Sequence, residues 1–509
     1  MASILNIFIR KFFKHPHPPI AAALGMFLSY YAYQYIFSWI ILLFIIGNIS
    51  LLRVLRLMQN NAENVSAMIK KLGITCLSVA VGFCLGIAAR GMMSSSVEFG
   101  LLPDRIVSVS GVLVEDPRTL HGGSGLGVLE LYECGSSDGS RATAAGRLTV
   151  FFPNDSIEDL MHFGRGAGLY LEGRLSSARS NSETDGYVFN SSSVHILSAP
   201  SPIERFRTGL RSGIIKSFQN RQGNYPPVWA ALSSALLLGV RDDLDVTLSA
   251  GFRNSGASHI LALSGMHLAI ISGLLAFLLK KPFGLKISSL IGAAFILIYV
   301  FIAGSQPSLV RAALMYLLGV FAIWTSLKIN IFSLFSAAFI LQLLFQSNSG
   351  ESISFILSYL AFFGMISLGN NIHKLLRGRI PAIFSGSISV SLGAFIMTAP
   401  IVVYHFGSLR PIGIISCIFL APLSSLFMLF SIFSLIVVSL PLPLWELISV
   451  VLEGIYRLME FFISFLGFVP GINITNVLPV LIFTIAFFIL ISFLTVWDEE
   501  RRAKLESFN

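Results

Sequence analysis

Small and polar residues gather at one end of a long apolar stretch, in the segment GASHILALSGMH at residues 256–267. Ser264 and His267 can hydrogen-bond to water or to a charged solute, and Gly265 weakens a helix by about 1 kcal/mol relative to alanine. A break in a membrane helix leaves backbone N–H and C=O groups without hydrogen bonds, which is tolerated only beside a water-filled cavity or packed protein. We therefore expect His259, Ser264, Gly265 and His267 to line a polar passage.

A charged residue lies in a later apolar run, Arg311 in VRAALM. An arginine inside a membrane costs about 2.5–3.5 kcal/mol on insertion scales, so it should face water, a carboxylate or a passing phosphate. Other interpretations stay open at this point. Serine and glycine often allow close packing of membrane helices, His259 could lie at the membrane interface, and Arg311 could extend to a headgroup.

The elements that would position these residues are membrane helices. Of the 509 residues, 54% are hydrophobic and 12% are charged, and several apolar runs approach the roughly 20 residues needed to cross a bilayer. We expect helices near 20–37, 38–52 and 72–90 and a further nine between 259 and 497, about twelve transmembrane helices in all. The predicted fold is therefore a polytopic α-helical membrane protein.

Basic residues gather in four of the predicted loops, at 10–14, 53–71, 280–286 and 373–379. Placing all four loops in the cytoplasm satisfies the positive-inside tendency. Both termini are then cytoplasmic, and the long segment after the third predicted span lies outside. Arg410 falls outside in this arrangement and is the one basic residue near a predicted span that does not fit it.

The segment outside has the pattern of a β domain. Five short runs alternate or are rich in strand-forming residues, at 105–114, 126–133, 146–152, 166–175 and 186–197. Five strands with glycine-rich connections predict a small external β-barrel of OB type, and a β-sandwich-like spacer is the alternative. OB barrels bind single strands by stacking bases on aromatic rings. The aromatic candidates for strand contacts, which could equally be structural, are Tyr132, Phe151, Tyr170 and Tyr187.

The net charge of +9 does not indicate a nucleic-acid surface on this domain. Residues 101–200 contain seven arginines, no lysine and twelve carboxylates, a net charge of −5. The positive excess therefore belongs mainly to loops beside the membrane. Cys76, Cys84 and Cys417 lie in predicted spans and Cys134 lies outside, so we expect no disulfide, no metal site and no cofactor.

Two shorter elements follow the β region. Residues 201–218 form a basic amphipathic segment, expected to be a helix in the headgroup layer. Its apolar residues recur at helical spacing and are Ile203, Phe206, Leu210, Ile214 and Phe218. The run PVWAALSSALLLG at 227–239 is too short to span a membrane and is predicted to be re-entrant or interfacial.

LLLGVRDDL (236–244) followed by FRNSGASHILALSGMH (252–267) resembles the core of ComEC-type competence proteins, inner-membrane channels for DNA internalisation. Three later blocks are similar to the family in the same order, GSQPSLVRAALM with Arg311, SISFILSYLAFFGM with Ser358, and TAPIVVYHFGSLRPIGIISCIFLAPL. The resemblance adds Ser358 to the candidate passage residues. It implies a bacterial inner-membrane protein that passes single-stranded DNA during natural transformation.

The resemblance also has two departures. Cys417 stands where the family usually has asparagine. Many members continue into a metallo-β-lactamase-like domain, whereas this sequence ends shortly after its final predicted span, and none of its nine histidines forms an H-x-H-x-D-H cluster. We therefore expect that domain to be absent and the protein not to be an enzyme.

Together these observations predict five consecutive regions along the chain. N-terminal membrane helices occupy 1–97, the external OB-like domain 98–200, amphipathic and interfacial helices 201–240, the competence-type channel domain 241–497 and a cytoplasmic tail 498–509.

The expected partners are single-stranded DNA and membrane lipid. Moving one negative charge inward against about 100 mV costs about 2.3 kcal/mol, and the sequence has no G-x-x-x-x-G-K-[ST] phosphate loop. We therefore expect the driving force to come from a separate cytoplasmic ATPase or strand-binding protein, or from coupled proton entry. A separate nuclease would degrade the other strand, and the oligomeric state stays open.

Two rival functions belong to other classes. A secondary transporter or an exporter of another solute or polymer would have similar broken helices and polar groups. An intramembrane serine protease would use Ser264 in ALSG (262–265), one residue from the G-x-S-G pattern, with His405 as its base.

Overall fold

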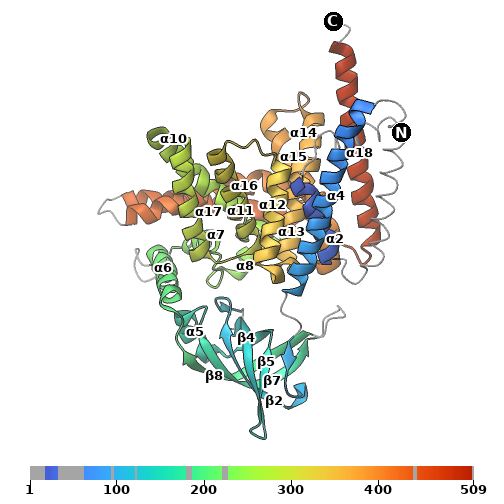
Figure 1. Ribbon diagram of the computed structural model, residues 1–509. Helices are drawn as coiled ribbons and strands as arrows, with labels where there is room; N and C mark the ends of the chain where they lie inside the picture. The colour runs from blue at the N-terminus through green and yellow to red at the C-terminus, as the bar shows by residue number, and fades with distance from the viewer. Residues whose placement is uncertain are drawn as a thin grey trace.

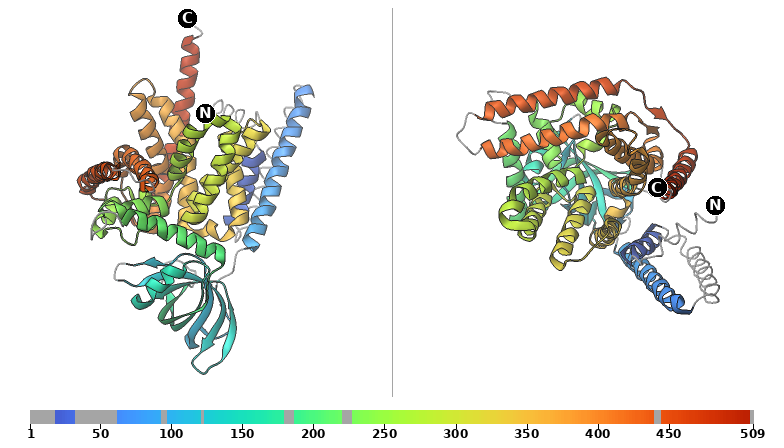
Figure 2. Two further views of the ribbon diagram at one scale, coloured as in Figure 1. Left: turned by 90° about the vertical axis from the view of Figure 1, so that its left-hand side faces the viewer. Right: turned by 90° about the horizontal axis from the view of Figure 1, so that it is seen from above.

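The computed structural model describes residues 18–31, 62–92, 97–120, 123–178, 186–219, 227–438 and 444–506. A sheet domain lies at one end of a bundle of helices, and helix α6 (Pro202–Gln219) runs along the boundary between them (Figures 1 and 2). Most long helices run roughly along the bundle axis. Helices α16 (Gly413–Val438) and α17 (Leu444–Gly467) pack side by side and lie across that direction (Figure 2).

The sheet domain has eight strands. They are β1 (Glu98–Phe99), β2 (Ile106–Leu113), β3 (Arg118–Thr119), β4 (Gly125–Ser136), β5 (Arg141–Ala145), β6 (Arg147–Phe152), β7 (Gly168–Ala178) and β8 (Gly186–Ser198). The order is β1-β5-β4-β2-β7-β8-β6, with β3 beside β4 and an additional pairing of β4 with β6. The five runs predicted from the sequence are the five longest strands.

The sequence predicted a simple five-stranded barrel. This prediction is wrong, because the domain is a larger sheet of eight strands. The short strands β1, β3 and β5 extend the sheet. Strand β4 is long enough to pair along one edge with two strands, β6 over its first half and β5 over its second. These strands cannot be recognised from alternating hydrophobicity, because β1 and β3 have only two residues each and β5 is rich in alanine. All pairs are antiparallel except β6 with β8, which is parallel.

The core of the sheet domain follows from alternation along each strand. In β6, Leu148, Val150 and Phe152 are buried, whereas the residues between them are more exposed. The short helix α5 (Ile157–Phe163) adds Ile157 and Leu160 to the same cluster. Each such side chain contributes about 1.5–3 kcal/mol when it is fully buried, so the domain has a hydrophobic core of its own.

The helical part begins with α2 (Pro18–Tyr31) and α4 (Ala62–Gly91). After α6 come α7 (Ala230–Leu238), α8 (Val246–Asn254), α9 (Ser258–Leu261), α10 (Gly265–Ala303), α11 (Pro307–Thr325) and α12 (Ile331–Phe345). Then follow α13 (Ile353–Gly364), a π-helical turn (Met365–Gly369), α14 (Asn370–Leu376), α15 (Ala382–Phe406), α16, α17 and α18 (Leu478–Glu506). Strands β9 (Ser408–Leu409) and β10 (Ile472–Asn473) pair between them.

The helical fold is that of a polytopic membrane protein, with fewer clear spans than expected. In the described part of the chain, seven helices are long and apolar enough to cross a membrane. Helix α17 lies in the region where nine spans were expected, but it is not among the seven because it carries Glu446, Glu453, Arg457 and Glu460. The predicted helix at 38–52 lies outside the described residues, so twelve spans are not established.

Helix α10 consists of two arms. Gly284 has a φ of +73° and follows Pro282, which interrupts the helical hydrogen bonds. Leu268 from the first arm and Ile296 from the second belong to one buried cluster that also includes Leu309 and Ala313 of α11, so both arms contribute to the same core. This agrees with the break that the basic loop at 280–286 predicts.

The two elements after the sheet domain differ in part from expectation. In α6, Ile203, Phe206 and Leu210 are exposed, but Phe218 is fully buried in the main helical cluster. Helix α7 is almost completely buried in the same cluster. A run of 13 apolar residues looks the same at an interface and in a core, and here packing makes α7 a core helix.

The N-terminal helices are fixed to the rest of the bundle. A Cβ on Gly82 of α4 would lie 1.8 Å from the carbonyl oxygen of Ala22 in α2, so only glycine permits this crossing. Tyr31 donates a hydrogen bond to the carbonyl of Gly350 at 2.8 Å. Helix α2 also packs against α12, so the N-terminal pair belongs to the same bundle.

Candidate functional site

The polar segment found in the sequence forms the start of α10. Ser264 is the N-cap residue, and its Oγ accepts a hydrogen bond from the backbone N–H of Met266 at 3.3 Å. His267 completes a capping box: its Nδ1 accepts from the Ser264 N–H at 3.0 Å and lies 3.0 Å from Ser264 Oγ. Because Nδ1 accepts, the ring proton belongs on Nε2. The predicted break is the turn between α9 and α10.

Arg311 lies in the first part of α11 and is only 6% exposed. Its Nη1 donates to the backbone carbonyl of Ser358 at 2.6 Å. The guanidinium carbon lies 4.9 Å from the ring centre of Phe362 and 5.7 Å from that of Tyr359. Arg311 forms no ion pair with any residue in the described ranges, so a carbonyl and two aromatic faces stabilise its charge.

The start of α10 packs directly against this arginine. An ideal Cβ on Gly265 would lie 3.4 Å from Arg311 Nη2. Three buried polar atoms in this region have no hydrogen-bond partner among the residues that the structure describes: His267 Nε2, Arg311 Nε and Ser358 Oγ. We call the set Ser264, Gly265, His267, Arg311 and Ser358 the Arg311 cluster. All five are candidate passage residues from the sequence, which could not show that Arg311 lies beside both Gly265 and Ser358.

His259, the sixth candidate, lies outside the Arg311 cluster. It is exposed in the short helix α9, with Nε2 3.3 Å from the Sγ of Cys417 in α16. The preceding turn is held close to α16, because an ideal Cβ on Gly256 would lie 2.8 Å from the Cα of Gly413. Gly256 also has a φ of +72°, which favours glycine. Cys417 therefore contacts a candidate residue at the position where the family usually has asparagine.

The four aromatic candidates of the sheet domain are not on one surface. Tyr132 is 47% exposed, and Tyr170 lies on the outward face, where its hydroxyl donates to Glu172 at 3.2 Å. Phe151 pairs in register with β8 at Asn190. Tyr187 packs against the core, with its ring 5.5 Å from that of Phe99 in an edge-on contact. Tyr187 is therefore structural.

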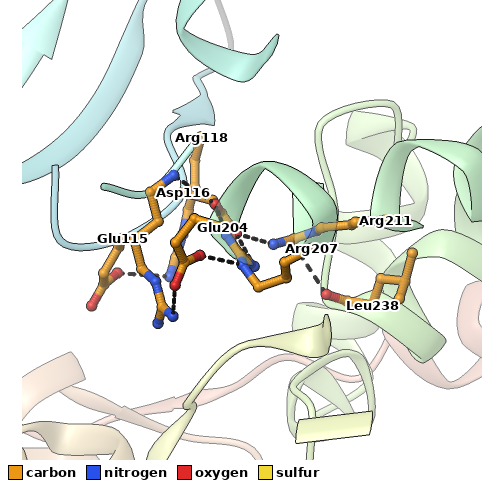
Figure 3. A network of polar contacts seen from close by, with 8 residues as sticks. Glu115, Asp116, Arg118, Glu204, Arg207, Arg211 and Leu238 are labelled. Carbon is orange, nitrogen blue, oxygen red and sulfur yellow. Dashed lines mark hydrogen bonds and ion pairs between the residues drawn. The ribbon is translucent and has the colours of Figure 1, made fainter. Parts of the chain in front are cut away.

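A network of ion pairs that the sequence did not reveal lies where the sheet domain meets α6 (Figure 3). Asp116, in the loop after β2, accepts two hydrogen bonds from Arg207 and one from Arg211. It also accepts the backbone N–H of Arg165 at 3.1 Å. Glu204 accepts from Arg207 Nε at 2.7 Å and forms an ion pair with Arg165. The Arg207 side chain is only 1% exposed.

The carboxylates of this network stay ionised. Burial raises the pKa of Asp116, but the hydrogen bond from Arg207 and the charges of Arg211 and Arg207 outweigh it, so the pKa lies below its ordinary value. The pKa of Glu204 is likewise lowered, because the bonds from Arg165 and Arg207 outweigh burial. The spacing of the arginines in α6 was visible in the sequence, but their partner 91 residues earlier was not.

No group of three or more histidine, cysteine or acidic side chains in the described ranges is arranged to hold a metal ion. All four cysteines are free thiols.

Comparison with known proteins identifies the family to which the region around this site is similar. Residues 236–501 match the family model described as competence protein. ComE operon protein 3 of Bacillus subtilis (strain 168) is 28% identical over 222 residues, which cover 43% of this chain and 27% of that protein. An uncharacterized protein of Aquifex aeolicus (strain VF5) is 27% identical over 241 residues, 46% of this chain and 54% of that protein. The matched parts thus span about a quarter and about half of these relatives.

Proposed function

This chain belongs to the competence protein family, and from that premise we propose that it is an inner-membrane channel for single-stranded DNA in natural transformation. The observation that carries the proposal is the family match over residues 236–501, which contains the whole Arg311 cluster. The proposed cargo is a polyanion, which crosses a membrane only through a passage lined by polar groups.

The chemistry of the Arg311 cluster supports an anionic cargo. His267 Nε2 and Arg311 Nε are both hydrogen-bond donors, and both are buried with no acceptor in the described part of the chain. A buried donor without a partner costs about 1–3 kcal/mol, and a phosphate oxygen supplies the missing acceptor. Arg311 also has no carboxylate beside it in the described ranges to compete for that ligand.

We further propose that the sheet domain is OB-like and receives or guides the strand. The parallel pairing of β6 with β8 and the pairing of β4 with both β2 and β6 support this assignment. Of the aromatic candidates, only Tyr187 packs against the sheet core, so bases could reach the rings of Tyr132, Phe151 and Tyr170. The net negative charge of this segment supplies no basic groove, so base stacking would have to provide most of the contact with the strand.

The proposed orientation places the sheet domain outside and both termini in the cytoplasm. Figure 1 supports it, because the sheet domain lies at one end of the bundle and the C-terminal end of α18 at the other. A cytoplasmic ATPase or strand-binding protein and a separate nuclease remain part of the proposal. Lipid would contact the exposed apolar faces of the spanning helices.

Deleting the gene tests the proposal directly. Cells without the protein should still bind labelled double-stranded DNA at their surface but accumulate none of it in the cytoplasm. Re-expression of the wild-type chain should restore internalisation. Unchanged internalisation in the deletion strain, with normal surface binding, would refute the channel function and favour a transporter of another solute.

The protease alternative receives a separate test. Ser264 Oγ contacts His267 within a helix cap, whereas His405, the expected base, has a ring contact with Tyr404. We therefore expect no labelling of Ser264 by a fluorophosphonate probe. Labelling that disappears in Ser264→Ala would contradict the channel proposal at this residue.

A further inference from the structure

The segment LLLGVRDDL forms a turn at which several parts of the molecule meet. It begins with the last residues of α7 and passes through Gly239, which ends the helix with a φ of +71°. An ideal Cβ on Gly239 would lie 2.9 Å from a methyl group of Leu263, immediately before Ser264. Glycine is therefore needed here for two reasons, the left-handed backbone and the close approach.

The last carbonyls of α7 are bound from two other helices. The carbonyl of Leu238 accepts a hydrogen bond from Arg211 Nη2 of α6 at 3.3 Å (Figure 3). The carbonyl of Leu237 accepts one from the hydroxyl of Tyr299 in α10 at 2.9 Å. Because Arg211 also binds Asp116 of the sheet domain, the end of α7 is linked to that domain through a single side chain.

The next two charged residues point to different partners. Arg241 Nη2 donates to the carbonyl of Leu261 at 2.8 Å, in the turn that leads into the Arg311 cluster. Asp242 Oδ1 accepts the backbone N–H of Thr119 in the sheet domain at 3.0 Å. Burial raises the pKa of Asp242, and the bond from Thr119 opposes this shift. Two adjacent side chains thus connect the sheet domain to the segment before Ser264.

We infer that Arg241 and Asp242 are positioning residues that hold the sheet domain in a fixed place relative to the start of α10. Neither needs to touch the cargo for this role. Arg241 fixes the turn before Ser264, and Asp242 fixes the loop at Thr119. The consequence for transport rests on the proposed function: a strand leaving the sheet domain would reach the Arg311 cluster only if the two are aligned.

Hydrogen–deuterium exchange of the full-length protein in detergent tests the positioning directly. Asp242→Ala removes the acceptor of the Thr119 N–H, so exchange of the peptide containing Thr119 should accelerate about tenfold. Asp242→Asn keeps an acceptor oxygen and should restore slow exchange. Asp243→Ala is the matched control, because Asp243 accepts from Gln219 at 3.0 Å and has no bond to Thr119.

Arg241→Ala should likewise accelerate exchange in the peptide that spans residues 258–263, with Arg253→Ala, an exposed arginine on α8, as its control. DNA internalisation should fall at least tenfold in Asp242→Ala and recover in Asp242→Asn. Unchanged exchange at Thr119 in Asp242→Ala would overturn the inferred positioning. Faster exchange with normal internalisation, while the deletion strain takes up no DNA, would overturn its role in transport and leave the channel proposal standing.

Discussion

Replacing Arg311 by methionine separates a transport role from a structural one. The substitution removes a charge-assisted hydrogen bond to Ser358, about 1.5–3 kcal/mol, and the contacts with two aromatic rings, about 1–2 kcal/mol. It also removes the cost of holding a guanidinium in the membrane, about 2.5–3.5 kcal/mol, and the unpartnered Nε, about 1–3 kcal/mol. Gains and losses therefore nearly cancel, and the net change in folding free energy is about 1 kcal/mol or less.

Arg311→Met should therefore fold normally and fail to transport. The apparent midpoint of thermal unfolding in detergent should stay within about 3 °C of wild type, whereas DNA internalisation should fall at least tenfold. Lys328→Met is the matched control, since Lys328 is an exposed cation in the loop after α11. A large loss of thermal stability in Arg311→Met would show that the arginine is structural. Normal internalisation would remove Arg311 from the passage.

Three further predictions concern the cap, the sheet domain and pH. Ser264→Thr keeps an N-cap acceptor without adding a charge and should retain internalisation, whereas Ser264→Ala should cost about 1 kcal/mol of local helix stability and lower internalisation; an equal loss of internalisation in both variants would contradict the capping role. Tyr132→Ala should weaken single-stranded DNA binding by about 1–3 kcal/mol in a fluorescence titration, whereas Tyr187→Ala should lower the unfolding midpoint instead; a normal titration for the Tyr132 variant would remove it from the contact surface. Because the folded pKa of Asp116 lies below 3.8, its contribution to the contact with α6 is complete above that value and is lost as the pH falls through the folded pKa. The distance between spin labels at positions 174 and 253 should therefore stay constant from pH 8 to 5, and a change within that range would show that other groups control the contact.

The amino-acid sequence determined the class of protein and most of its elements. Apolar runs of spanning length can only satisfy their backbone groups as helices in lipid, and alternation located the five longest strands. It failed where length or pattern was ambiguous. Helix α7 packs in the core instead of at an interface, and the described residues contain seven clear spans, not the expected twelve.

Only the tertiary structure decided what the polar residues contact. His267 accepts a bond from its own helix start, Arg311 binds a carbonyl 47 residues later, and Asp116 binds α6 across 91 residues. Periodicity reports which face of an element is buried, because burial repeats with the backbone geometry. Partners far apart in the chain depend on how the elements are packed together, and no local pattern records that arrangement.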